Sequence, residues 1–327
     1  MIKFFRQSYA IQYVMLALLA IALWLPSFRP GGAVTGMESA VTPIYNFVAR
    51  LLRGSSIAQH TVALVLLLGE ALLFNVILTE NQIIGKVGTM GAFVFIMLMS
   101  LTRTQIAFYP FALSVPFILL VLGKLYGVYL AQKPEFDLFK AGIYIAFASM
   151  CYFPSFILVL WAMIALSIAK KGSLRLLLLP ITGFLFVYFF YYSYVFLFGD
   201  FLPLIQGYSE WFAELSFTVE GFNLRIVILL SFLTLVPILL FVGGGNSNFD
   251  KTIAVRTKLT MSIILSLFSL VLLFLGGNVL FHGLIFVVLT VVIAYEFSYL
   301  GNTGWADLFL TVFLLLVFAN QYYFNWL

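Results

Sequence analysis

Charged residues are scarce in this chain of 327 residues. They make up 9% of it, against about 25% in a soluble domain, while hydrophobic residues make up 64%. No stretch between the apolar runs is large enough for a soluble domain, and no solenoid-type repeat is present. These deficits exclude an ordinary soluble protein. They indicate an all-α, polytopic membrane protein with a single transmembrane domain over residues 1–327.

Residues that build metal and redox sites are also scarce. Cys151 is the one cysteine, which excludes an internal disulfide and a cysteine metal site. His60 and His282 are far apart in sequence and do not support a histidine metal site. The glycine run 243–245 lacks the lysine of a phosphate loop, and no nucleophile elbow is present. The basic residues cluster at the ends of apolar runs, as membrane insertion requires, so we expect no nucleic-acid partner.

Apolar runs long enough to form membrane helices recur along the chain. A spanning helix needs roughly 20 apolar residues. Lys3 and Arg6 precede the first run, which is too long for a signal-peptide core and has no cleavage site. We interpret that run as a retained span with a cytoplasmic N-terminus. The expected spans are Tyr9–Phe28, His60–Thr79, Val87–Leu101, Ile106–Leu122, Leu176–Phe198, Leu224–Val242, Leu259–Leu275, Val279–Ala294 and Trp305–Tyr323.

The apolar run 141–169 has an unusual length. Its 29 residues are too many for one span and too few for two, which need roughly 40. Pro154, near the middle, removes a backbone donor, so a helix must bend or break there. We predict a short helical hairpin that enters and leaves on the cytoplasmic side. With it the fold has about 11 membrane segments and a periplasmic C-terminus.

The distribution of lysine and arginine favours this hairpin. With it, 12 basic residues face the cytoplasm and 5 face outward. A single crossing by residues 141–169 would reverse every later loop and give 7 inside and 10 outside. The positive-inside bias therefore selects the hairpin. The predicted cytoplasmic residues are Lys3, Arg6, Lys86, Lys124, Lys133, Lys140, Lys170, Lys171, Arg175, Lys251, Arg256 and Lys258.

The predicted extracytoplasmic loops are 29–59 and 199–223, and the first contains an amphipathic helix near 38–53. Glu38 could act as a general base or metal ligand, or be a solvated acid at the helix start. Arg50 and Arg53 could grip a lipid phosphate, or simply form the polar face of that helix. Arg103 lies in the next outside turn, where it could face the same phosphate or anchor the interface.

Glu70 is an acid inside an apolar run, where an ionised carboxylate is costly. It should mark an ion path or ligand site, or be a protonated or paired packing group. His60 could titrate near neutral pH or be an interface residue. The second outside loop could bind a cation or sugar, or be an acidic surface that lacks basic residues. Its acids are Asp200, Glu210, Glu214 and Glu220, of which Glu210 and Glu214 would share a face if a helix forms.

The segment AGIYIAFASMCYFPSFILVLWAMIALS, followed by RLLLLPITGFLFVYFF, resembles a family of uncharacterised bacterial polytopic inner-membrane proteins. The resemblance covers most of the chain and is sharpest over 136–190. It implies a location in the bacterial inner membrane, and it carries no catalytic motif.

More distantly, the layout is similar to the GT-C superfamily of membrane glycosyltransferases, which use polyprenyl-phosphate sugars. Ala141, Gly142 and Pro154 match the superfamily's helical hairpin, and Glu38 with helix 45–52 matches its outer loop. The chain carries Arg103-Thr104-Gln105 where those enzymes usually have a second acid, and it lacks their hairpin lysine.

This resemblance implies a GT-C-like scaffold for cell-envelope assembly that handles a polyprenyl-phosphate-linked sugar and contacts membrane lipids. In a glycosyltransferase, Glu38 would be the base or metal ligand, with a divalent cation as the candidate cofactor. Arg50, Arg53 and Arg103 would hold the phosphate. One alternative is a non-catalytic membrane subunit or accessory factor of an envelope or secretion complex, with a membrane-protein partner. Another is a transporter or flippase that uses Glu70.

Overall fold

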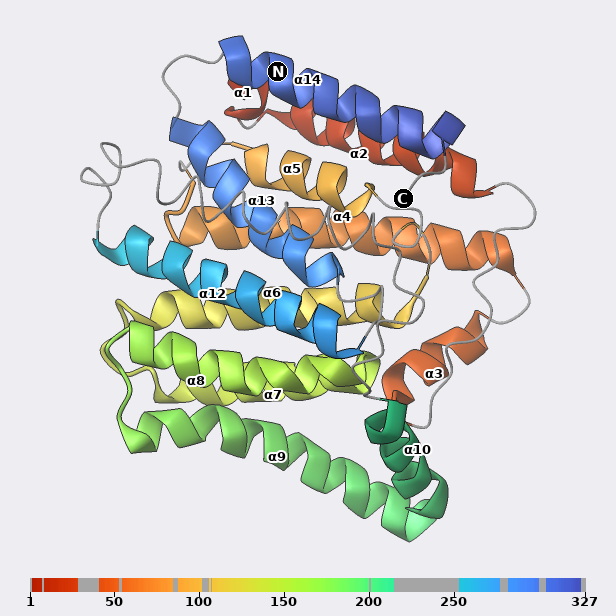
Figure 1. Ribbon diagram of the computed structural model, residues 1–327, viewed down its shortest axis with the longest axis vertical. Coiled ribbons are helices and arrows are strands. Elements are labelled where there is room, and N and C mark those ends of the chain that lie inside the picture. Colours follow the sequence, from red (N-terminus) through yellow and green to blue (C-terminus); the bar gives the residue numbers. More distant parts are fainter. Residues whose placement is uncertain are drawn as a thin grey trace.

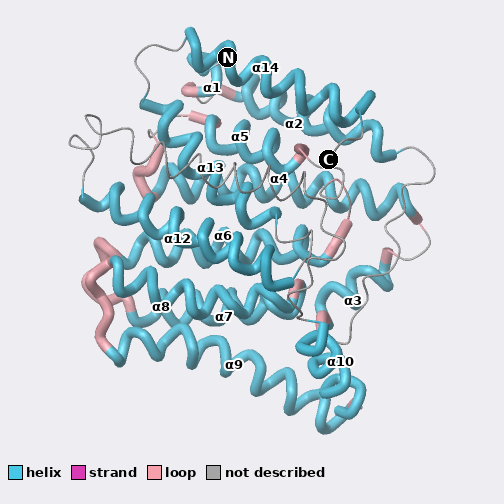
Figure 2. The backbone as a smooth tube through the Cα atoms, in the orientation of Figure 1, coloured by secondary structure: helices cyan, strands magenta, loops and turns pink. Residues whose placement is uncertain are grey.

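The protein is described by a computed structural model, and every regular element that it describes is a helix (Figure 1; Figure 2). The helices lie side by side, and the loops between them gather at two opposite ends of a bundle (Figure 2). The described residues are 2–7, 9–28, 41–52, 55–84, 88–101, 106, 108–199, 201–214, 253–276, 282–299 and 304–324.

The helix boundaries follow the apolar runs closely. The first half of the chain forms α1 (Ile2–Phe5), α2 (Ala10–Trp24), η1 (Leu25–Phe28), α3 (Pro43–Leu51), α4 (Ser56–Glu80), α5 (Met90–Met99), α6 (Pro110–Val128), α7 (Glu135–Cys151), η3 (Phe153–Ile157) and α8 (Leu158–Ile168). The second half forms α9 (Leu174–Phe198), α10 (Phe201–Glu214), α12 (Ile253–Gly276), α13 (His282–Tyr299), α14 (Gly304–Ala319) and the π-helical η5 (Asn320–Phe324).

Four described helices are long and apolar enough to cross a membrane: α2 with η1, α4, α6 and α9. The 25 residues of α4 extend about 37 Å at 1.5 Å per residue, enough for a hydrocarbon core of about 30 Å. Their length and composition indicate a membrane protein. The span expected over 224–242 lies outside the described residues, so the count of about 11 segments stays a prediction.

The helix α5 is shorter than the span predicted over 87–101. Its ten residues extend only about 15 Å, half the thickness of a hydrocarbon core. All ten are buried, and both α4 and α13 pack against them. A helix that is apolar on every side belongs in a protein interior. The core of the bundle is therefore built around α5.

Side chains from other helices satisfy the backbone at both ends of α5. Before its first turn, Asn75 Nδ2 of α4 donates to Gly88 O at 2.9 Å. After its last turn, Gln321 Nε2 donates to Ser100 O at 2.7 Å, and Asn320 Nδ2 donates to the next carbonyl, of Leu101, at 2.9 Å. These bonds matter because backbone groups inside a membrane must find protein partners.

The predicted fold-back is present, although its turn is not at the proline. Tyr152 interrupts the helices with an extended backbone, at φ −140° and ψ 100°. Pro154 instead lies in the first turn of η3, where its missing N–H costs no helical hydrogen bond. On the far side, Lys171 Nζ donates to Ala131 O at 3.3 Å, which ties the chain after α8 to the chain before α7. The α7–α8 pair thus starts and finishes at one end of the bundle (Figure 1).

Two glycines let α7 and α9 pack very closely. A Cβ on Gly142 would lie 2.9 Å from Phe184 N and closer still to Pro180 O. A Cβ on Gly183 would lie 3.1 Å from the carbonyl carbon of Phe139 and would overlap its oxygen. Small residues at a crossing point are how membrane helices bring their backbones together.

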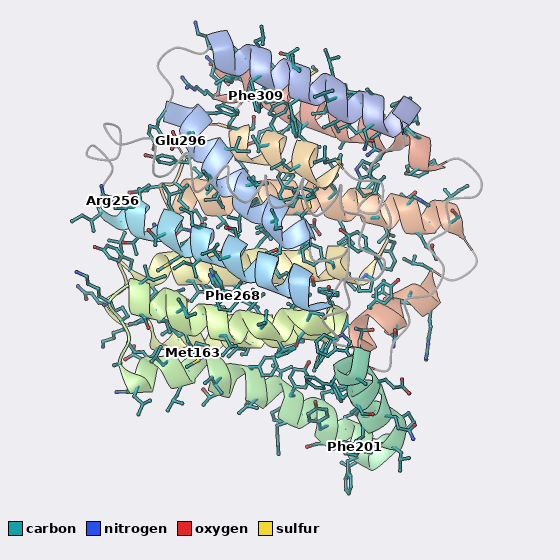
Figure 3. All side chains as sticks on the ribbon, in the orientation of Figure 1. Met163, Phe201, Arg256, Phe268, Glu296 and Phe309 are labelled. Atoms are coloured by element: carbon teal, nitrogen blue, oxygen red, sulfur yellow. The ribbon has the colours of Figure 1, made fainter. Side chains whose placement is uncertain are left out.

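The described basic residues divide very unequally between the two ends of the bundle. Of the described basic residues, only Arg50 lies at the α3–α10 end, where α3 and α10 lie (Figure 1). At the opposite, basic end, Arg6 donates to Phe297 O at 2.6 Å and Lys258 Nζ to Asn81 O at 2.7 Å. Figure 3 shows Arg256 and Glu296 at the basic end, far from Phe201 of α10. The basic end holds Lys3, Arg6, Lys124, Lys133, Lys140, Lys170, Lys171, Arg175, Arg256 and Lys258.

This division matches the grouping of loops predicted from charge. The division also agrees with the direction of α14. This helix begins at the basic end, where Ile2 N donates to Asp307 Oδ1 at 2.6 Å. At its other end, the Tyr322 hydroxyl donates to Ala22 O at 2.8 Å. Which end faces the cytoplasm stays a prediction.

Candidate functional site

Glu70 lies in the interior of α4, one of two described helices of 25 residues that are long enough to cross a membrane. It is 14 residues, or about 21 Å, from Ser56 and is only 4% exposed. Its Oε1 atom is fully buried and has no hydrogen-bond partner among the described residues. Since nearly all buried polar atoms in proteins are paired, such an atom needs a specific explanation.

The Glu70 cavity is a space of about 20 Å³ between α2, α4, α5 and α6, lined by Glu70 with Trp24, Met99 and Tyr109. A cavity of this size holds about one water molecule. The Glu70 carboxyl and the Tyr109 side chain both border this space. The indole N–H of Trp24 already donates to Ser100 Oγ at 3.1 Å. Among the described lining residues, the polar groups open to the cavity are therefore one carboxyl and one phenol.

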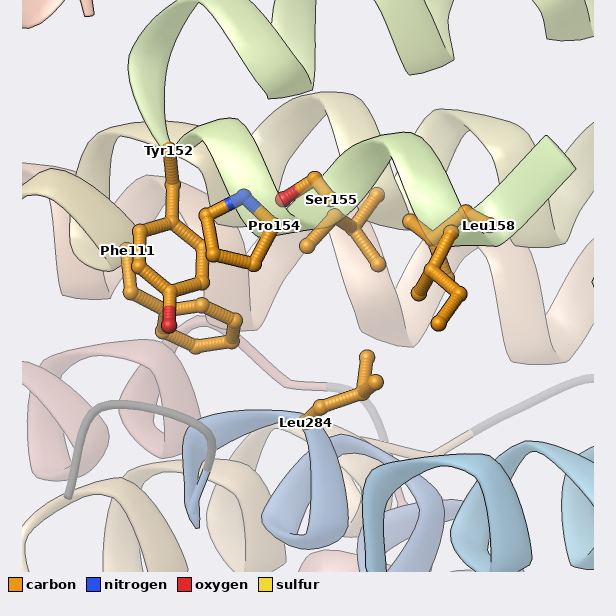
Figure 4. A pocket seen from close by; sticks show the side chains of 8 residues that line it. Phe111, Tyr152, Pro154, Ser155, Leu158 and Leu284 are labelled. Atoms are coloured by element: carbon orange, nitrogen blue, oxygen red, sulfur yellow. The ribbon is translucent and has the colours of Figure 1, made fainter. Parts of the chain in front are cut away.

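A smaller cavity of about 10 Å³ lies beside the fold-back turn (Figure 4). Phe111 and Tyr152 meet edge to face there, with ring centroids 5.7 Å apart, and Pro154 and Leu284 lie nearby (Figure 4). None of the described residues that line it is charged. We interpret it as a packing gap at the turn.

The helix α3 has the features of a helix that lies in a membrane interface. Its inner face is anchored by buried Tyr45, whose ring stacks on Phe108 at 5.5 Å. Phe47 and Leu51, one turn apart, are 66% and 70% exposed, and Arg50 beside them is also exposed. An apolar pair next to an exposed cation suits the boundary between lipid headgroups and acyl chains.

The helix α10 forms within the predicted acidic loop. Trp211 packs on the fold-back turn, 4.8 Å from the Phe153 ring and 6.1 Å from Phe156. The Tyr192 hydroxyl donates to Tyr208 at 3.1 Å. Burial raises the pKa of the Tyr208 hydroxyl, which keeps it neutral. Aromatic contacts therefore fix α10 against the turn.

The predicted site residues are described only in part. Arg50, His60, Glu70 and Glu210 are described, and no hydrogen bond or ion pair joins any two of these four. The described backbone of Glu214 ends α10, so Glu210 and Glu214 share a helix face, as expected if a helix formed. Outside the described residues lie Glu38, Arg53, Arg103, Asp200 and Glu220, so a pocket that combines Glu38 with Arg103 stays a prediction.

His60 is buried, at 3% exposure. Its Nδ1 lies 2.8 Å from Ser56 O, and because a carbonyl oxygen only accepts, Nδ1 carries the proton in that bond. Its ring also lies 5.6 Å from that of Phe28. These contacts give His60 a role in holding the start of α4.

Sequence reasoning missed the residues that surround Glu70. Tyr109 precedes Pro110, and this pair could have signalled a helix start, because proline favours the first helical position. Nothing in the sequence, however, places Trp24 and Tyr109 beside a carboxyl on a different helix. That proximity depends on how α2, α4 and α6 pack.

Within the described part of the chain, no three histidine, cysteine, aspartate or glutamate side chains lie together as a metal site. No protein-family model, no curated protein and no solved structure matches this chain.

Proposed function

We propose that this protein handles a lipid-linked phosphate at its α3–α10 end, on a GT-C-like scaffold in the bacterial inner membrane. In its full form, the proposal makes the ligand a polyprenyl-phosphate-linked sugar used in envelope assembly. The observation that carries it is the exposed group Phe47, Arg50 and Leu51 on α3.

The chemistry of this group suits such a ligand. The apolar pair Phe47 and Leu51 can enter the acyl region and hold α3 at headgroup level. A guanidinium can then donate two parallel hydrogen bonds to one phosphate, which an ammonium cannot. Arg53 and Arg103 complete the proposed phosphate site, and Glu38 would serve as base or metal ligand in sugar transfer.

Among the described residues, the α3–α10 end holds one basic side chain and the basic end holds ten, which supports a periplasmic location for the site. Basic residues are retained on the cytoplasmic side during insertion, so the basic end would face the cytoplasm. The N-terminus would then be cytoplasmic.

Phosphate binding tests the proposal directly. Purified protein would be titrated with a short polyprenyl phosphate in mild detergent, with native mass spectrometry as the readout. We expect Arg50→Gln to weaken binding about tenfold or more, because a hydrogen bond to a charged group contributes about 1.5–3 kcal/mol. Arg50→Lys should be intermediate. The matched control is Arg175→Gln, an exposed arginine at the basic end, which should bind normally. Unchanged binding by Arg50→Gln would contradict the proposal.

Glycosyl transfer requires a separate test. A Glu38→Ala variant that binds the lipid but transfers no sugar would support the catalytic form of the proposal. Full activity in this variant would remove Glu38 from the mechanism. Mass spectrometry of protein extracted in mild detergent addresses the alternative. A stoichiometric membrane-protein partner without any phosphate lipid would favour a non-catalytic subunit of an envelope or secretion complex.

A further inference from the structure

The Glu70 cavity combines three features that packing alone does not explain. A carboxyl lies deep in a membrane-length helix, one of its oxygens has no hydrogen-bond partner among the described residues, and the space beside it holds about one water. We propose that Glu70 is a proton-binding site, whose carboxyl carries a proton in the resting protein and exchanges it through the cavity shared with Tyr109.

The groups that face Glu70 favour the neutral carboxyl. From α2 the cavity receives Trp24, from α5 Met99, and from α6 Tyr109 together with Ala112 and Val115. Among the described residues, no lysine, arginine or histidine lines it, and α5 contains no ionisable residue. Tyr109 is thus the one other titratable group facing the carboxyl from the described helices packed around it. An isolated carboxylate in an apolar environment costs several kcal/mol, so the carboxyl keeps its proton.

The cavity suits a proton better than a metal ion. Magnesium needs six ligands in octahedral geometry, and calcium takes six to eight oxygens. The described lining residues offer only the Glu70 carboxyl and the Tyr109 hydroxyl, and the cavity has room for about one water. A proton needs a single oxygen, and the water can exchange one of its own protons for that of the carboxyl.

Release of this proton would have a structural consequence. The ionised carboxylate would need more hydrogen-bond donors than one water and one phenol supply. Loss of the proton would therefore require α4 and α6 to separate or further water to enter. Glu70 would act as a proton-linked switch within the membrane, independently of any phosphate binding at α3.

Infrared spectroscopy of the whole protein in lipid nanodiscs tests the proposal. At neutral pH we expect a C=O stretching band from a protonated carboxyl, because the solvated acids of the chain are ionised there. Glu70→Gln should lack this band, and Glu70→Asp should shift it. The matched control, Glu80→Gln, changes an exposed acid at the end of the same helix and should keep the band unchanged.

Transfer of the wild-type protein into D₂O provides a test that needs no variant. The carboxyl band should shift well before the backbone amides of α5 exchange, because the cavity would admit water while α5 stays closed. Absence of a Glu70-dependent band at neutral pH would overturn the proposal by showing an ionised group. A band that resists deuterium for as long as the α5 amides would also overturn it, since Glu70 would then be a sealed packing group.

Discussion

Because α7 and α9 cross closely, we predict that Gly142→Ala destabilises the protein strongly, although it adds only one methyl group. The added methyl group would lie 2.9 Å from Phe184 N and would overlap Pro180 O. A carbon atom normally stays about 3.3–3.6 Å from a carbonyl oxygen. Both obstacles are backbone atoms, so no side-chain rotation relieves the clash. The two helices would have to move apart.

The magnitude follows from two opposing effects. Overpacking typically costs about 1–3 kcal/mol, and a clash with backbone atoms belongs near the upper limit. Alanine regains about 1 kcal/mol over glycine through its higher helix propensity. The net loss should be about 2 kcal/mol, which corresponds to a fall in melting temperature of about 4–8 °C on the scale of domains of 150–250 residues.

The matched control for this prediction is Gly69→Ala, on α4. A Cβ there meets nothing within 4 Å, so only the gain in helix propensity remains. Thermal unfolding of both variants and the wild type, followed by tryptophan fluorescence in one detergent, gives the comparison. If Gly142→Ala melts at or above the temperature of Gly69→Ala, the close crossing is refuted.

Three further predictions concern the capping side chains, the ion pair and the topology. Replacing both Asn320 and Gln321 with alanine should lower the free energy of unfolding by about 2–6 kcal/mol, because two buried carbonyls lose their donors. A double variant as stable as the wild type in urea titrations would contradict this prediction. Lys124→Ala should lower the free energy of unfolding by at most about 1 kcal/mol in the same assay, because the side chains of its 2.8 Å ion pair with Asp137 are 34% and 40% exposed. A larger loss would contradict this prediction. A reporter enzyme fused after Gly172 should report the cytoplasm if the basic end faces it, and a periplasmic signal would reverse the proposed sidedness.

The sequence was sufficient to predict the helices whose apolar runs match the thickness of a membrane. The run 60–79 became α4, and 176–198 became α9, each within a few residues. The fold-back of residues 141–169 could be predicted because length, proline and charge all favoured it. Its turn is at Tyr152, since a proline in the first turn of a helix interferes less than one in its middle.

Other features depend on packing between distant segments, which periodicity does not encode. The run 87–101 has the composition of a span, yet only ten residues are helical because Asn75, Asn320 and Gln321 satisfy the backbone at its ends. Burial of Glu70 could be predicted from its apolar neighbours in sequence. Its proximity to Tyr109 could not, because that contact needs α4 and α6 in their final positions.

The capping of α5 also sets an order for biosynthesis. The carbonyls of Ser100 and Leu101 receive their donors from Asn320 and Gln321, some 220 positions later. While the chain emerges from the ribosome, this half-length helix must therefore wait in the translocon or lipid with its C-terminal carbonyls open. Only when residue 321 has been translated can these carbonyls be paired, so assembly of the centre depends on a segment made some 220 positions after α5.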